Sequence, residues 1–89
     1  MDKRFTRTSL IIGEDSIDKL SQSRVAVFGI GGVGGFVCEA LARSGVEKLT
    51  LIDGDKVAKS NINRQIIALQ STIGKYKAEV MKNRILDIN

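Results

Sequence analysis

Histidine is absent from this sequence of 89 residues, cysteine occurs once, and there is neither tryptophan nor proline. Without histidine the chain cannot build a Ser-His-Asp triad or a zinc site with histidine ligands. The single cysteine, Cys38, excludes an internal disulfide and a cysteine-ligated metal cluster, as is typical of proteins in a reducing compartment. We therefore expect a cytoplasmic protein.

Long hydrophobic runs and linker-like tracts are missing too. The apolar run at residues 10–12 is far too short for a signal-peptide core or a membrane span. The sequence has no low-complexity tract and no internal repeat that would mark a linker or a second domain. A chain of this length buries only roughly 60 to 65% of its unfolded surface. We expect residues 1–89 to form part of one small domain with a marginal core.

The composition is that of an ordinary globular protein, with 43% hydrophobic and 27% charged residues. The formal net charge of +4 favours anionic partners. The basic residues, however, are spread along the chain among acids and form no block. The charge is therefore weak evidence for nucleic acid, and nucleotide phosphates, an acidic partner or a solvated basic surface fit as well.

Three consecutive segments predict a right-handed β-α-β unit. Residues 24–29 are apolar and β-branched and end in glycine, which is typical of a strand buried on both faces of a parallel sheet. Residues 33–44 predict a helix ended by Gly45, and residues 48–53 predict a second strand with an acid at its carboxyl end. The helical residues that we expect to face the core are Val33, Phe36, Val37, Ala40 and Leu41.

The rest of the chain predicts further helices. A short one is expected at residues 16–21, a second short one is compatible with residues 64–69, and an amphipathic helix is predicted over residues 75–88. That last helix would need a third strand to cross back to, and the sequence stops before one. The predicted fold class is α/β, a Rossmann-like parallel sheet truncated after the second strand and the helices that follow it, with open edges that invite association with another chain.

A glycine-rich turn lies between the first predicted strand and helix. Gly29, Gly31 and Gly34 match the pattern G-x-G-x-x-G, in which glycines allow a tight turn and let a phosphate approach the backbone amides. Asp53 ends the second strand, where its carboxylate can accept hydrogen bonds from ribose hydroxyls. Together they predict a nucleotide site, either of an NAD-dependent oxidoreductase or of an enzyme that uses ATP.

Polar and basic residues after Asp53 distinguish these two alternatives. A dehydrogenase has no evident need for Asn61, Arg64 and Lys77, whereas adenylation of a carboxylate builds negative charge on the α-phosphate and on the departing pyrophosphate. Arg64 offers a bidentate fork, Lys77 a point charge and Asn61 a neutral donor. The pattern predicts a clamp for a triphosphate, and the NAD-dependent alternative ranks last.

These motifs resemble those of the ThiF/MoeB/HesA family, which is related to ubiquitin-activating enzymes. The resemblance rests on GIGGVG at 29–34, LIDGDKVAKSNINRQ at 51–65 and GKYK at 74–77. It implies an adenylating enzyme that uses ATP and Mg²⁺, with Asp53 holding the ribose and with Asn61, Arg64 and Lys77 at the phosphates. The residues implied to bind the nucleotide are Gly29, Gly31, Gly32, Gly34, Asp53, Asp55, Asn61, Arg64, Gln65 and Lys77.

The amino-terminal RFTRT, residues 4–8, resembles the family's arginine segment, in which an arginine crosses a homodimer to the partner's ATP. That residue would be Arg7, which would act in catalysis together with Arg64 and Lys77. In relatives the aspartate that positions magnesium and the catalytic cysteine both lie further along the chain than residue 89. We therefore expect no metal ligand here, a core role for Cys38, and no activity from this segment alone.

Within the family, residues 4–15, 23–34 and 61–69 most resemble the branch of tRNA threonylcarbamoyladenosine dehydratases. This resemblance implies a tRNA substrate whose threonylcarbamoyl carboxylate is adenylated and then cyclised. Two alternatives remain open. The substrate could be the carboxyl-terminal glycine of a ubiquitin-like sulfur carrier, with a sulfur-transfer partner, or the chain could be a non-catalytic dimerisation module.

Overall fold

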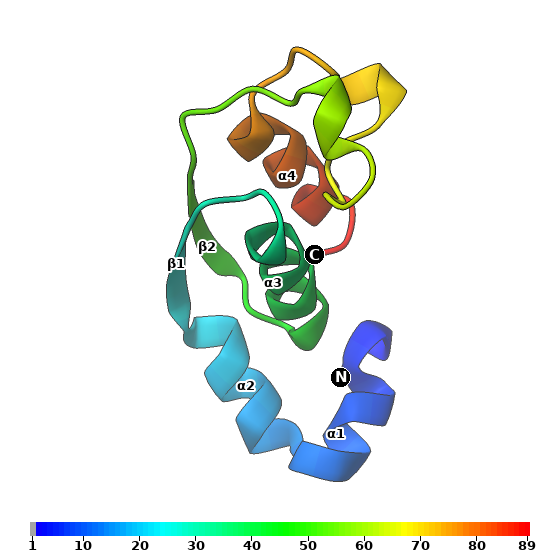
Figure 1. Cartoon of the computed structure of the whole chain (residues 1–89). Coiled ribbons are helices and arrows are strands. Elements are labelled where there is room, and N and C mark those ends of the chain that lie inside the picture. The colour runs from blue at the N-terminus through cyan, green and yellow to red at the C-terminus, as the bar shows by residue number, and fades with distance from the viewer. Residues whose placement is uncertain (1) are drawn as a thin grey trace.

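The computed structural model describes residues 2–89 (Figure 1). Two parallel strands carry the site-bearing loops, and helices precede, connect and follow them. In chain order the elements are the 3₁₀ helix η1 (Lys3–Phe5), α1 (Thr6–Ile12), α2 (Glu14–Gln22), β1 (Arg24–Phe28), α3 (Val33–Ser44), β2 (Lys48–Ile52), the 3₁₀ helices η2 (Lys59–Asn61) and η3 (Gln70–Thr72), and α4 (Lys77–Leu86). The α/β fold class, both strands, α3 and its end at Gly45 confirm the predictions from sequence.

Strands β1 and β2 pair in parallel, with Arg24 opposite Lys48 and Phe28 opposite Ile52. The prediction that β1 is buried on both faces is wrong, because Val27 is buried whereas Phe28 is 76% exposed. The reason is visible in Figure 1, where α3 and α4 lie on the same side of the two strands. The side chains that alternate toward this side join the core, and those on the other side remain exposed.

The core lies between the sheet and the helices α3 and α4. It contains a cluster of buried apolar residues, namely Val27, Ile30, Cys38, Val57, Ile67, Ala68 and Met81. The predicted buried stripe of α3 is wrong in most of its members: Val33, Phe36, Val37 and Ala40 are exposed, and only Leu41 packs partly against the core. The face turned inward carries the small residues Gly35, Cys38 and Ala42. Small side chains allow α3 to approach its neighbours closely, since a Cβ at Gly35 would lie 2.9 Å from Ile66 Cγ2.

The segment between β2 and α4 contains turns and two 3₁₀ helices. The short helix considered for residues 64–69 does not form, since only turns occur there. The Thr72 hydroxyl supplies a reason, because it donates to Ile67 O at 2.7 Å and accepts from Leu69 N at 2.8 Å. The second bond occupies the Leu69 N–H, which would donate to Gln65 O in a helix over these residues, while Ile67 and Ala68 are buried in the core. Helix α4 forms as predicted but covers Lys77–Leu86, within the predicted range of 75–88.

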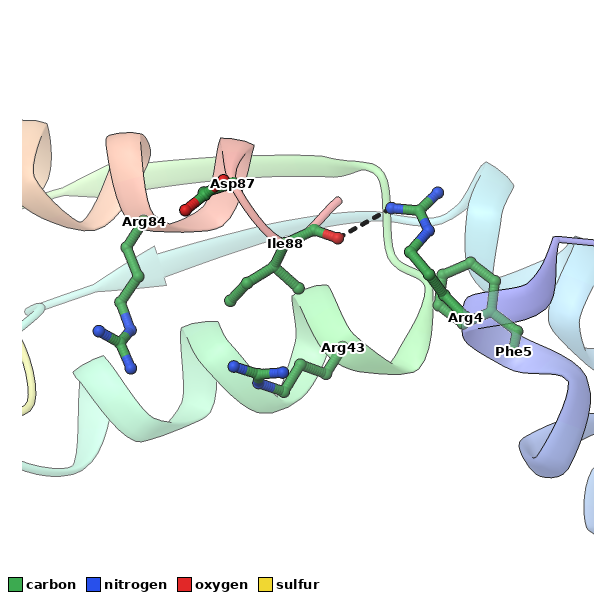
Figure 2. A pocket seen from close by; sticks show the side chains of 6 residues that line it. All are labelled: Arg4, Phe5, Arg43, Arg84, Asp87 and Ile88. Carbon is green, nitrogen blue, oxygen red and sulfur yellow. Dashed lines mark hydrogen bonds between the residues drawn. The ribbon is translucent and has the colours of Figure 1, made fainter.

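The amino-terminal helices lie at the end of the molecule opposite the loop that joins β2 to α4 (Figure 1). Helix α2 matches the predicted short helix and extends it, whereas α1 was not predicted. Arg4 connects this region to the end of the chain, because its Nη1 donates to Ile88 O at 2.9 Å (Figure 2). Its guanidinium also pairs with Asp2, whose pKa is lowered to about 2 chiefly by that side-chain hydrogen bond. Among residues 2–89 no helix is both long and apolar enough to cross a bilayer.

Candidate nucleotide site

The glycine-rich turn connects β1 to α3 and depends on glycine at defined positions. Gly29 continues the sheet, since its N–H donates to Ile52 O at 2.8 Å, and its φ of +87° then turns the chain. A Cβ at Gly34 would lie 1.7 Å from Gly29 O, so no side chain fits between the end of the strand and the start of the helix. Gly32 precedes α3 with a φ of +53°. The amides at the start of α3 have no partners within the helix, so this terminus favours an anion.

Asp53 ties the end of β2 to this turn. Its Oδ2 accepts from Ile30 N at 2.8 Å and its Oδ1 from Asp55 N at 2.8 Å. Desolvation on partial burial raises the pKa of Asp53, but these two hydrogen bonds and the positive charge of Lys77 outweigh it and leave the pKa below its ordinary value. The carboxylate is therefore ionised at neutral pH, and each oxygen keeps acceptor capacity for a hydroxyl.

Lys77 is the first residue of α4 and is 8% exposed. Its N–H donates to Asp55 O at 3.0 Å, so the end of β2 and the start of α4 lie side by side. Its positive charge also contributes to the lowered pKa of Asp53, although the two side chains form no direct ion pair among residues 2–89. A buried lysine beside an ionised aspartate, at the end of a parallel sheet, suits a ligand that carries both hydroxyls and phosphates.

Asn61 and Gln65 form the wall of the site on the loop side, and both are largely buried. Asn61 Oδ1 accepts from Ala58 N at 2.8 Å, which fixes the side chain and leaves the amide NH₂ as its donor. The Gln65 amide lies against the turn, because a Cβ at Gly31 would be 2.8 Å from its Nε2. Gln65 Oε1 is buried and finds no hydrogen-bond donor among residues 2–89. This oxygen is therefore an acceptor that a polar ligand beside the glycine-rich turn could satisfy.

Two predicted residues are not brought into this group. The Arg64 guanidinium turns back onto its own loop, where Nη1 donates to Ser60 O at 3.1 Å and to Asn63 Oδ1 at 2.9 Å. It is exposed, so only these two contacts must break for it to reorient. Arg7 lies in α1, at the far end of a molecule that is 41 Å long (Figure 1). It cannot contribute to the glycine-rich turn of its own chain.

A separate groove of about 540 Å³ lies beyond the carboxyl end of α3, where Arg4, Arg43 and Arg84 line it (Figure 2). Three carboxylates compensate these three charges: Arg4 pairs with Asp2, Glu39 pairs with both Arg43 and Arg84, and Asp87 also lines the groove. Arg43 and the first residue of α3 are separated by about 15 Å of helix. The groove is therefore distinct from the glycine-rich turn and offers no net positive charge to an anion.

The chain of residues 2–89 carries no cluster of three or more His, Cys, Asp or Glu side chains that could hold a metal ion. Cys38 is completely buried, and desolvation raises the pKa of its thiol although a backbone hydrogen bond opposes the shift. This burial confirms the prediction that Cys38 belongs to the core.

Comparison with known proteins decides the family of this chain. The model of the ThiF family matches residues 4–89, which is nearly the whole chain. The chain belongs to the ThiF family. The motifs that first suggested the resemblance are the ones that the structure gathers at the carboxyl ends of β1 and β2.

Several relatives of this ThiF-family chain are tRNA-modifying enzymes. This chain is 52% identical to the tRNA threonylcarbamoyladenosine dehydratase of Bacillus subtilis, over 97% of its own length and 34% of that protein. It is 36% identical to the molybdopterin-synthase adenylyltransferase of Escherichia coli, over 97% of this chain and 35% of that protein. The crystal structure of the E. coli tRNA N6-threonylcarbamoyladenosine dehydratase in complex with ATP superposes with a TM-score of 0.94 at 48% identity, covering 97% of this chain and 35% of the other. The chain thus spans about a third of the length of these relatives.

Sequence reasoning missed two features of the site. One is the backbone N–H of Ile30, which holds Asp53 but which no side-chain motif reveals. The other is the contact of Lys56 with Tyr76, whose ring centroid lies 5.1 Å from Lys56 Nζ. A signal existed for the second, since Tyr76 is the only tyrosine of the chain and lies between two lysines.

Proposed function

We propose that this chain forms the ATP-binding front part of an adenylation domain that activates a carboxylate. The observation that carries the proposal is that an ionised Asp53, hydrogen-bonded to Ile30 N in the glycine-rich turn, lies two residues before Asp55, whose carbonyl oxygen accepts from the N–H of the buried Lys77. This arrangement offers acceptors for ribose hydroxyls and a cation for phosphates within one site. The solved complex of a 48% identical relative with ATP supports the same conclusion.

The residues fit a nucleoside triphosphate in their donor chemistry. The glycine-rich turn brings the backbone amides of the first turn of α3, which has no side-chain cap, to the site, and Gln65 and Asn61 add amide groups beside them. In adenylation a carboxylate oxygen bonds to the α-phosphorus while the bond to the departing pyrophosphate breaks, so charge moves onto the phosphate oxygens. Lys77 is positioned to stabilise that charge, and Arg64 would join it after releasing its two loop contacts. Mg²⁺ would be held mainly by the phosphate oxygens and would neutralise part of this charge.

The same geometry argues against the NAD-dependent alternative. Asp53 and the glycines would serve either nucleotide, but in a dehydrogenase the buried ammonium group of Lys77 would have no role in hydride transfer. The relatives with solved structures include complexes with ATP and with AMP.

We further propose that the carboxylate belongs to the threonylcarbamoyl group of a tRNA, which the parent enzyme adenylates and cyclises. The dehydratases of B. subtilis and E. coli, at 52% and 47% identity, support this choice over a sulfur-carrier substrate. The molybdopterin-synthase adenylyltransferase, at 36%, keeps the carrier alternative as the second candidate. ATP consumption that depends on modified tRNA, and not on a carrier protein, would distinguish them.

Arg7 supports an arrangement of two chains. Because α1 lies at the end of the molecule opposite the glycine-rich turn, a role for Arg7 at a nucleotide requires the site of a second copy (Figure 1). We propose such a homodimer. Mixing an Arg7→Ala chain with a Lys77→Ala chain should restore some nucleotide binding, because one mixed site carries both native residues. Failure of the mixture to exceed either variant alone would exclude the shared site.

Calorimetric titration with ATP and Mg²⁺ tests the proposed function directly. We expect wild-type chain to bind, and Lys77→Ala and Arg64→Ala to weaken binding by about tenfold each, the effect of losing one charge-assisted contact. Lys82→Ala is the matched control, because Lys82 is an exposed lysine of the same helix, away from Asp53. NADH binding that ATP does not displace, or equal affinity of all variants, would refute the proposal.

A further inference from the structure

The segment that leads from β2 into α4, residues 54–78, carries a local excess of basic residues, with Asp53 just before it and Glu79 just after it. Between residues 54 and 78 the sequence has five basic residues and one acid, so this segment accounts for the whole formal net charge of +4. The remaining residues contain equal numbers of basic and acidic side chains. Nine of the fourteen basic residues lie outside this segment among as many acids, as the dispersed pattern of the sequence indicates, so the excess at residues 54–78 is local.

Hydrogen bonds hold two parts of this segment side by side. Val57 N donates to Lys75 O at 2.8 Å and Gly74 N to Val57 O at 2.9 Å, and an antiparallel bridge pairs Lys56 with Tyr76. Bridge partners share one face, and here Lys56 Nζ lies over the Tyr76 ring, 5.1 Å from its centroid. Tyr76 as a whole remains 50% exposed. The bridge thus holds a partly exposed tyrosine ring together with the ammonium group of Lys56.

Part of this charge exceeds what a nucleotide needs. Lys77 is buried and Arg64 donates to its own loop, whereas Lys56, Lys59 and Lys75 are exposed. None of these three lysines forms an ion pair with a carboxylate within residues 2–89. Their charges are available to a partner that approaches the site from solvent.

We propose that Lys56, Lys59, Lys75 and Tyr76, here called the basic–aromatic rim, bind the RNA substrate, the lysines contacting backbone phosphates and the tyrosine stacking on an unpaired base. This inference rests on the proposed function, since it concerns how a tRNA reaches the adenylation site. Sequence-tolerant RNA binding typically combines lysines along the backbone with exposed aromatic rings. An acidic protein tail would use the lysines but gains nothing from a half-exposed ring.

The test is fluorescence anisotropy of a labelled tRNA transcript titrated with the 89-residue chain over a series of salt concentrations. Each substitution of a rim lysine by alanine should lower the slope of log affinity against log salt by about 0.7 to 0.9, the value for one lost phosphate contact. Tyr76→Ala should weaken binding at least about fivefold with an unchanged slope, whereas Tyr76→Phe should restore it because phenylalanine also stacks. Lys19→Ala, exposed on α2 at the opposite end, is the control and should bind as wild type does.

Three results would overturn the inference: no RNA binding by a chain that circular dichroism shows to be folded, equal loss in Lys19→Ala and the rim variants, or insensitivity to Tyr76→Ala. Polyglutamate that competes as well as RNA, regardless of Tyr76, would point to an acidic peptide and would also overturn it. Titration with ATP keeps the two proposals separate. If the wild-type chain binds ATP but the rim substitutions leave RNA binding unchanged, only the proposal about the rim is refuted. If the folded wild-type chain does not bind ATP, the proposed function is refuted.

Discussion

The contact between Gly31 and Gln65 allows a quantitative test of how the glycine-rich turn is built. A Cβ at Gly31 would lie 2.8 Å from Gln65 Nε2, 2.9 Å from Cδ and 3.0 Å from Oε1, and its three nearest neighbours all belong to that one side chain. The φ of Gly31 is not positive, so its backbone conformation itself accepts alanine. The need for glycine at position 31 therefore comes from the space that Gln65 fills.

The magnitude follows from that geometry. Gly31→Ala should destabilise the native chain by about 1 to 3 kcal/mol, the usual cost of overpacking, because Gln65 is only 9% exposed and its side chain has little room to move away. In a Gln65→Ala background the same change should become neutral or stabilising by about 0.4 to 1 kcal/mol, because alanine restricts the unfolded chain more than glycine does. The sign of the effect of Gly31→Ala should thus reverse between the two backgrounds.

Urea denaturation followed by circular dichroism on the four chains measures this coupling. Gly34→Ala is the control, because its Cβ would meet backbone, at 1.7 Å from Gly29 O, and removal of Gln65 cannot relieve that clash. An equal cost of Gly31→Ala in both backgrounds would refute the reasoning, as would rescue of Gly34→Ala by Gln65→Ala.

Three other predictions concern single residues. Hydrogen bonds lower the pKa of Asp53 in the folded chain, so this residue should stabilise the fold fully above the ordinary carboxyl pKa and less as the pH falls toward the folded value. Urea titrations between about pH 2 and 7 should therefore show a smaller loss of stability at acid pH for Asp53→Asn than for wild type. The same loss in both chains would contradict this. Because Cys38 is buried and its pKa is raised, iodoacetamide should alkylate it about 100-fold more slowly in the native chain than in urea. Equal rates in the two conditions would show that Cys38 is not protected. Arg4→Ala removes the bond to Ile88 O, so amide exchange should accelerate in α1 but not in β1; unchanged exchange in α1 would show that Arg4 does not hold that helix.

The sequence predicted the parts of the fold whose signals are local. Both strands are short apolar runs bounded by turn residues, and Gly45 marks the end of α3 where the chain adopts a φ of +108°. The side-by-side placement of Asp53 and the glycine-rich turn also follows from sequence, since the carboxyl ends of parallel strands meet at one edge. These predictions needed no knowledge of long-range packing.

The errors arise where packing between elements overrides local pattern. The core face of α3 was assigned by its largest apolar residues, whereas the closest packing selects Gly35, Cys38 and Ala42. The short helix considered for residues 64–69 does not form, and the Leu69 N–H, which would donate to Gln65 O in such a helix, donates to the Thr72 hydroxyl instead. The conformation of the Arg64 side chain was likewise not accessible from sequence, because it depends on the carbonyl of Ser60 and the amide of Asn63 in the folded loop.

The position of Tyr76 gives this molecule a built-in optical probe. The chain has one tyrosine and no tryptophan, so ultraviolet emission beyond the weak signal of its phenylalanines comes from a single ring at the edge of the nucleotide site. A ligand that displaces the Lys56 ammonium group or covers the ring changes that emission directly, whereas an event at α1 or α2 leaves the surroundings of the ring unchanged. Unlabelled protein can therefore report on where a ligand binds as well as on whether it binds.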